Sequence, residues 1–201
     1  MELDALEIFE KSLSFELTDP YYYIDKNALT KETCKGIIDL FESLPQHKGV
    51  TSGGLMLDTK RTFEVQIQGN VWKEYDAILC ESLYRAVDNY SMHLINKCNN
   101  HNLMDKTLTD SGYQIQKYIK YDGYYKWHSD DRINNERSAR AITFLWYLND
   151  IEEGGETYFY NGKVKPEAGK LILFPATWTY NHKGNMPKSD DKYIITGWVS
   201  Y

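Results

Sequence analysis

Residues 113–130 read YQIQKYIKYDGYYKWHSD, two alternating runs separated by Asp122-Gly123. This alternation predicts β-strands at 113–121 and 124–130 with a turn between them. Residues i and i+2 of a strand face the same side, so we expect the side chains of His128 and Asp130 to point together. Four further strand-like runs follow at 141–148, 157–160, 170–174 and 192–199. Glycine, asparagine, aspartate and proline separate them, so the second half is predicted to be a sandwich or barrel.

The first half of the chain has helical periodicity instead. Apolar residues recur at three- and four-residue intervals in 3–13 and in 71–98, and Thr30 precedes a third predicted helix, 30–44, that Pro45 ends. A short aromatic strand is expected at 21–24, and the glycines of 47–60 indicate a mobile loop. We therefore expect one α+β domain over residues 1–201, helical to about residue 110 and rich in strands from about 111.

Composition limits the classes of function. The formal net charge of −6 disfavours a nucleic-acid partner. Cys34, Cys80 and Cys98 have no metal or redox spacing and predict buried, reduced thiols in a cytoplasmic protein. Residues 1–17 lack the basic and long apolar segments of a signal peptide, and no stretch approaches the length of a membrane span, so we expect no membrane partner.

A candidate metal site stands out in the second half. Two histidines and one carboxylate hold non-haem Fe(II) with coordination positions left open. His128 and Asp130 supply two such ligands, and His182, 54 residues after His128, supplies the third. A structural zinc module fits poorly, since only three ligands are present and none has cysteine spacing. Lys192 offers a cation for an acidic co-substrate; its alternative is an ordinary solvent-facing lysine.

The segments around these residues carry a family resemblance. They read RAITFLWYLND (140–150), IEEGGETYF (151–159), GKLILFP (169–175), HKG (182–184) and KYIITGWV (192–199). In this order and spacing, residues 113–199 resemble the prolyl 4-hydroxylase branch of the Fe(II)/2-oxoglutarate-dependent dioxygenases. The resemblance implies a double-stranded β-helix, or jelly-roll, with the N-terminal helices buttressing one sheet.

The same resemblance implies the ligands of iron and of 2-oxoglutarate. His128, Asp130 and His182 match the iron ligands. Lys192 and Thr157 match residues that bind the distal carboxylate of 2-oxoglutarate. The family also uses a tyrosine there, in a Tyr-x-x-Gly segment that is shortened in this chain. Tyr121 is the candidate for that tyrosine and Tyr118 the alternative.

The resemblance places three more residues at a peptide groove. They are Tyr125, Arg140 and Trp198. Tyr125 and Trp198 have the alternative of being plain core aromatics. Arg140 has the alternative of an ion pair with an acid such as Glu156.

The implied activity is hydroxylation of a C–H bond with release of succinate and carbon dioxide. The cofactors are Fe(II) and 2-oxoglutarate, with ascorbate as reductant, and the partners are dioxygen and a proline-containing peptide or protein. The alternatives are a free amino acid or other small molecule as substrate, or a non-catalytic jelly-roll binding module. Demethylation of nucleic acid is disfavoured, because such enzymes typically hold the distal carboxylate with arginine rather than lysine.

Overall fold

The computed structural model describes residues 4–15, 17–103, 107–131 and 139–201. Its long helix is α3 (Lys73–Cys98), which follows a single 3-10 turn, η1 (Asn70–Trp72). Helix α2 (Lys31–Glu42) starts where Thr30 accepts a hydrogen bond from the backbone N–H of Thr33, as expected of a threonine N-cap. Helix α1 (Ala5–Ser12) has no buried residue. The three predicted helices are therefore confirmed, although Leu3 lies outside the described residues.

Thirteen strands form two antiparallel sheets in the described part of the chain. The larger sheet has the order β1-β11-β8-β13-β6-β4-β2, with β5 also paired to β13. Its strands are β1 (Tyr23–Asp25), β2 (His47–Lys48), β4 (Phe63–Ile67), β5 (Thr109–Asp110), β6 (Tyr113–Tyr118), β8 (Arg140–Tyr147), β11 (Leu171–Pro175) and β13 (Lys192–Ser200). The smaller sheet has the order β10-β9-β12-β7-β3. Its strands are β3 (Lys60–Arg61), β7 (Tyr124–His128), β9 (Thr157–Phe159), β10 (Gly162–Val164) and β12 (His182–Gly184).

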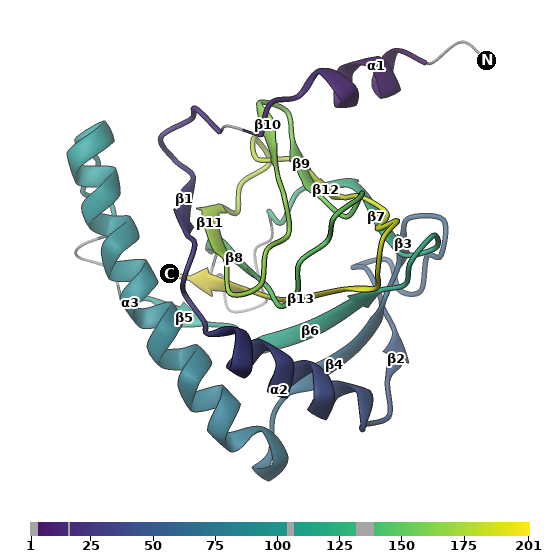
Figure 1. Cartoon of the computed structure of the whole chain (residues 1–201). Helices are drawn as coiled ribbons and strands as arrows, with labels where there is room; N and C mark the ends of the chain where they lie inside the picture. Colours follow the sequence, from purple (N-terminus) through teal and green to yellow (C-terminus); the bar gives the residue numbers. More distant parts are fainter. Residues whose placement is uncertain (1–3, 16, 104–106, 132–138) are drawn as a thin grey trace.

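The two sheets face each other, and helices α2 and α3 cover the outer face of the larger one (Figure 1). The apolar side chains predicted for α3, among them Leu79, Leu83 and Tyr90, are buried together with Ile37 and Phe41 of α2 against that sheet. A second cluster, which includes Tyr147, Phe159 and Phe174, lies between the sheets. Two apolar layers thus pack the larger sheet between the helices and the smaller sheet, as in a jelly-roll with buttressing helices.

The structure corrects three expectations about the first half. Residues before 111 supply not only β1, which overlaps the strand expected at 21–24, but also β2 to β5 to the two sheets. The segment 47–60 is not wholly a loop, because its ends pair as β2 with β4 and as β3 with β7. Of the three cysteines only Cys34 is buried, while Cys80 is exposed and Cys98 half-buried. Short, polar strands such as 47–48 and 60–61 carry too few residues for a periodicity signal.

No helix within the described residues is long and apolar enough to cross a membrane.

Candidate active site

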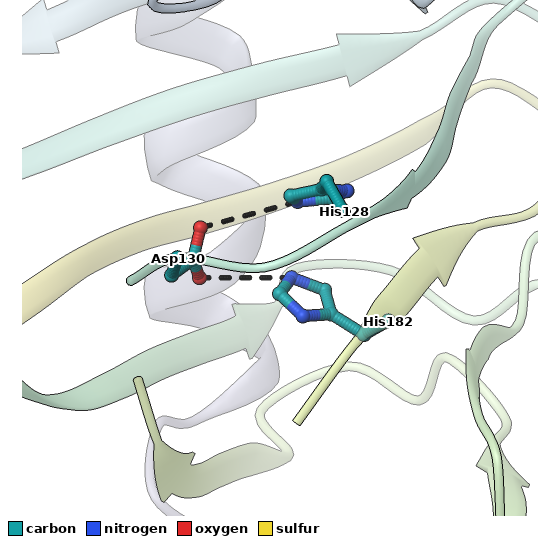
Figure 2. A group of neighbouring side chains, drawn as sticks. All are labelled: His128, Asp130 and His182. Atoms are coloured by element: carbon teal, nitrogen blue, oxygen red, sulfur yellow. Dashed lines mark ion pairs between the residues drawn. The ribbon is translucent and has the colours of Figure 1, made fainter. Parts of the chain in front are cut away.

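Three side chains predicted as metal ligands converge from the smaller sheet. His128 ends β7, Asp130 follows two residues later, and His182 begins β12 directly opposite His128. Asp130 faces both imidazoles (Figure 2): its Oδ1 lies 4.0 Å from His128 Nε2, and its Oδ2 lies 3.6 Å from His182 Nε2. One ligand atom from each residue lies within 4.8 Å of the other two, so the group can hold a metal ion.

Backbone carbonyls orient both imidazoles for ligation. His128 Nδ1 lies 2.7 Å from the carbonyl oxygen of Lys126, and His182 Nδ1 lies 3.2 Å from that of Tyr180. A carbonyl oxygen can only accept, so each Nδ1 carries the proton and donates it. Each Nε2 is then the unprotonated atom and faces Asp130, which is the tautomer a metal ligand needs.

The protonation states also suit a cation. Burial, together with the nearby His182, lowers the pKa of His128 well below its ordinary value. Burial alone would raise the pKa of Asp130, but the two imidazoles, the Thr143 hydroxyl and the Trp198 indole hold it below its ordinary value. His128 is therefore neutral and Asp130 is an anion at neutral pH, the forms that bind a metal.

Neighbouring side chains fix the three ligands in place. The Thr143 hydroxyl donates a 2.8 Å hydrogen bond to Asp130 Oδ2. The ring of Tyr125 stacks on the His128 imidazole with centroids 3.5 Å apart. Arg140 lies over the Trp198 ring at 3.3 Å from its centroid and donates to the Asp130 carbonyl oxygen at 3.3 Å. Tyr125, Arg140 and Trp198 thus surround the candidate metal group.

The ligand group opens into a cavity of about 300 Å³ between the two sheets. Strands β6 and β13 line its far wall in register, pairing Tyr118 with Lys192, Gln116 with Ile194, and Gln114 with Thr196. Tyr125, Arg140 and Trp198, the three residues predicted at a groove, all line the same cavity. All three therefore border the space in front of the ligand group, where a substrate would lie.

Lys192 is enclosed in this cavity wall. Only 1% of it is exposed, and its Nζ donates to the carbonyl oxygen of Gly155 at 2.9 Å and lies 4.0 Å from the centroid of the Tyr118 ring. No carboxylate in the described part of the chain forms an ion pair with it, and burial lowers the pKa of Lys192 to about 7. A buried lysine without an acid partner is rare and unfavourable, so this cation is suited to an anionic ligand.

Thr157 lines the same cavity as Lys192 and is 2% exposed. Its hydroxyl accepts a 2.7 Å hydrogen bond from the hydroxyl of Tyr147. The Thr157 hydroxyl hydrogen is therefore available to another acceptor, and the cavity is on that side.

The structure does not bring Tyr121 to the site. Tyr121 is 66% exposed, has a positive φ of 61° and bonds through its backbone N–H to the Pro187 carbonyl. Tyr118, the alternative, is 3% exposed and lines the cavity next to Lys192. Strand β6 ends at Tyr118, three residues before the end of the predicted strand 113–121, so its last inward position falls on Tyr118.

Sequence reasoning missed part of the polar wall of the cavity. Lys60 and Glu64 form an ion pair although each is at least 96% buried, and the Thr62 hydroxyl donates to the same carboxylate at 2.9 Å. Gln114 and Gln116 also face the cavity. The alternation in 113–118 could have signalled the two glutamines, because Tyr113 and Ile115 face the helices on the opposite side.

Part of the chain is similar in sequence to known proteins. The model of the 2OG-Fe(II) oxygenase superfamily matches residues 113–200. Probable prolyl 4-hydroxylase 9 of Arabidopsis thaliana is 31% identical over 104 residues, 40% of this chain and 36% of that protein. Probable prolyl 4-hydroxylase 10 of the same plant is 22% identical over 187 residues, 78% of this chain and 58% of that protein. The chain therefore spans less than two-thirds of these curated relatives.

Solved structures share the fold. A prolyl hydroxylase from Trichoplax adhaerens, in complex with a hypoxia inducible factor peptide fragment, has a TM-score of 0.68 at 21% identity, covering 96% of this chain and 91% of that one. A viral collagen prolyl hydroxylase from Paramecium Bursaria Chlorella virus-1, solved as a 2OG complex, has a TM-score of 0.64 at 19% identity, covering 90% and 96%. The chain is thus similar in sequence to the 2OG-Fe(II) oxygenase superfamily over residues 113–200 and to plant prolyl 4-hydroxylases, and it shares the fold of solved prolyl hydroxylases.

Proposed function

We propose that this protein hydroxylates a C–H bond of a prolyl residue in a peptide or protein, using Fe(II), 2-oxoglutarate and dioxygen and releasing succinate and carbon dioxide. The observation that carries the proposal is Lys192, a buried cation that forms no ion pair with any carboxylate of the described residues and lines the cavity that the His128–Asp130–His182 group faces. A metal group alone fits many reactions. A metal-ligand group that shares its cavity with a buried lysine fits a co-substrate that chelates the metal through one end and carries a second negative charge at the other.

The donor set fits iron in its reduced state. Two unprotonated imidazole nitrogens and one carboxylate leave coordination positions free for other molecules. His128, Asp130 and His182 would hold the ion, while Thr143 and the carbonyls of Lys126 and Tyr180 keep the ligands in orientation. Bound iron supplies the activation of dioxygen, and the protein supplies position and shielding.

The opposite wall would bind the distal carboxylate of 2-oxoglutarate. Lys192 gives a charge-assisted hydrogen bond, and the hydroxyls of Thr157 and Tyr118 can each donate one more. Burial raises the pKa of Tyr118 well above its ordinary value, so its hydroxyl keeps the proton it would donate. Three donors that line the cavity, two from the larger sheet and Thr157 from the smaller one, would satisfy a carboxylate that would otherwise be costly to bury.

The aromatic and cationic side chains around the ligand group would receive the substrate. Tyr125 and Trp198 offer faces suited to a pyrrolidine ring, and an extended proline-rich chain loses little entropy on binding. Arg140, held over Trp198, offers donors to peptide carbonyls. The polar residues Gln114, Gln116 and Thr196 in the same cavity favour, as the second candidate, a free amino acid or similar small molecule.

The test is mass spectrometry of a peptide library incubated with the protein, Fe(II), 2-oxoglutarate, ascorbate and air. Gain of one oxygen atom, localised to proline and dependent on both iron and 2-oxoglutarate, is the expected result. Oxygen on another residue type would reject the prolyl substrate and keep the dioxygenase. Succinate formation stimulated by free amino acids, but by no peptide, would select the second candidate.

A further inference from the structure

Two glutamine side chains connect the ends of the cavity along β6. Gln114, Gln116 and Tyr118 alternate with the residues that face the helices, so all three line the cavity. Tyr118 stands opposite Lys192, and Gln114 stands opposite Thr196, on the way to Trp198. Four strand residues span roughly 13 Å, too far for one side chain to contact both ends.

Hydrogen bonds join these three residues in a single direction. The Tyr118 hydroxyl donates to Gln116 Oε1 at 3.2 Å, and Gln116 Nε2 donates to Gln114 Oε1 at 2.8 Å. The Gln114 amide makes no other hydrogen bond within the described part of the chain. In this arrangement Gln114 Oε1 is already hydrogen-bonded, so the group that Gln114 offers to the cavity is its Nε2, which is a donor.

The direction of this chain depends on one proton. A tyrosine hydroxyl has one hydrogen, and a glutamine side chain has an acceptor oxygen and a donor nitrogen. If the Tyr118 hydrogen goes to another acceptor, the Tyr118 oxygen can only accept from Gln116 Nε2. Gln116 Oε1 then faces Gln114 and requires its Nε2, so Gln114 Oε1 is released as an acceptor. Two amide rotations by half a turn are sufficient, because the oxygen and nitrogen of an amide have nearly the same shape.

We propose that Gln116 and Gln114 are a hydrogen-bond relay by which 2-oxoglutarate at Tyr118 reverses the polarity of Gln114 at the substrate end of the cavity. The inference rests on the proposed function, in which the Tyr118 hydroxyl donates to the distal carboxylate. Loaded with 2-oxoglutarate, Gln114 presents an acceptor and recognises a substrate that carries a hydrogen-bond donor, such as a peptide N–H. One neutral hydrogen bond gained or lost there corresponds to a change of roughly fivefold in substrate affinity.

The relay can be followed at Gln114 itself. The 23.5 kDa protein is labelled with ¹⁵N only in its glutamine side chains and loaded with Zn(II) in place of iron. It is then titrated with 2-oxoglutarate while the NMR resonances of the side-chain amides are recorded. The resonances are assigned with Gln114→Leu and Gln116→Leu, and binding of 2-oxoglutarate is measured in parallel by calorimetry. In the wild type, both amide pairs should shift with the same dependence on 2-oxoglutarate.

Three variants separate a relay from a nearby charge. In Tyr118→Phe at saturating 2-oxoglutarate, and in Gln116→Leu, the Gln114 resonances should no longer respond. Thr196→Val is the matched control: its hydroxyl lies on the Gln114 rung but donates to the Phe144 carbonyl at 3.0 Å, outside the relay. In that variant the Gln114 response should match the wild type.

The outcomes distinguish the relay from the proposed function. If 2-oxoglutarate binds but the wild-type Gln114 resonances stay in place, or still move in Gln116→Leu, the relay is overturned and the proposed function stands. If the Zn(II)-loaded wild type binds no 2-oxoglutarate at all, the proposed function fails and the relay fails with it.

Discussion

Replacing Lys192 by methionine tests the central feature of the cavity, because methionine keeps an unbranched side chain that is shorter by the terminal amine and removes the charge. Burial, only partly offset by the charge of Glu156, lowers the pKa of Lys192 from 10.5 to about 7. A displacement of that size disfavours the charged form by roughly 5 kcal/mol, as an order of magnitude for a side chain that is 1% exposed. Lys192 is thus unfavourable for folding and suited to bind an anion.

Because the pKa of Lys192 is lower in the folded protein than in the unfolded chain, the free energy of unfolding should depend on pH. Between pH 7 and 10.5 the unfolded chain binds the Lys192 proton more tightly than the folded protein, so the stability of the free protein rises with pH across this range. Lys192→Met removes this dependence. It should raise the free energy of unfolding at pH 7 by up to roughly 4 kcal/mol, as the charge no longer has to be buried.

Binding of 2-oxoglutarate should change in the opposite way. A buried ion pair that loses one partner typically costs about 3–5 kcal/mol, which is two to more than three powers of ten in affinity. In the wild type, affinity should fall as pH rises above about 7, since binding then requires Lys192 to take up a proton. In Lys192→Met it should be weak and independent of this titration.

Urea unfolding of the free protein measures the effect on stability. Calorimetric titration of the Zn(II)-loaded protein with 2-oxoglutarate measures the effect on affinity, and each series runs from pH 6 to 9. Lys170→Met is the control, because Lys170 is 6% exposed but is paired with Glu167 at 2.9 Å. That variant should be less stable than the wild type and bind 2-oxoglutarate normally. Equal 2-oxoglutarate affinity in Lys192→Met and the wild type would refute the reasoning.

Four further predictions concern the metal ligands, the cavity wall and the outer face of the smaller sheet. His128→Ala or His182→Ala should abolish stoichiometric Mn(II) binding in calorimetry, whereas Asp131→Ala should keep it; retention in either histidine variant would contradict the ligand set. Thr157→Val should weaken 2-oxoglutarate binding by about 1–2 kcal/mol for one lost hydrogen bond, and an unchanged dissociation constant would remove Thr157 from the site. Trp198→Ala should reduce peptide hydroxylation far more than succinate release without peptide; an equal fall in both rates would make Trp198 a core residue. Glu10→Gln should lower the free energy of unfolding by about 1–3 kcal/mol, because Glu10 accepts from Lys183 at 2.6 Å and from Trp127 at 3.1 Å. A loss of stability no larger than that of the exposed Glu7→Gln control would show that these contacts of helix α1 do not stabilise the fold.

Sequence alone determined the elements with long periodic patterns. The helix at 71–98 and the capped helix after Thr30 each bury one face, and most of the six strand-like runs from 113 onward are buried on one or both faces. This burial leaves alternating or continuous apolar runs in the sequence. The His-x-Asp spacing placed two candidate ligands on one face, and the surrounding segments carried the family resemblance. These features depend on neighbours in the chain, which a sequence displays directly.

Tertiary structure decided what depends on register between distant strands. It brought His182 opposite His128, selected Tyr118 instead of Tyr121 beside Lys192, and paired Lys60 with Glu64 inside the cavity wall. It also showed that strands from the first half complete both sheets. A shift of one residue in a strand turns every side chain to the other face, so no local pattern could fix which tyrosine or lysine reaches the cavity. Packing of the helices and both sheets sets that register.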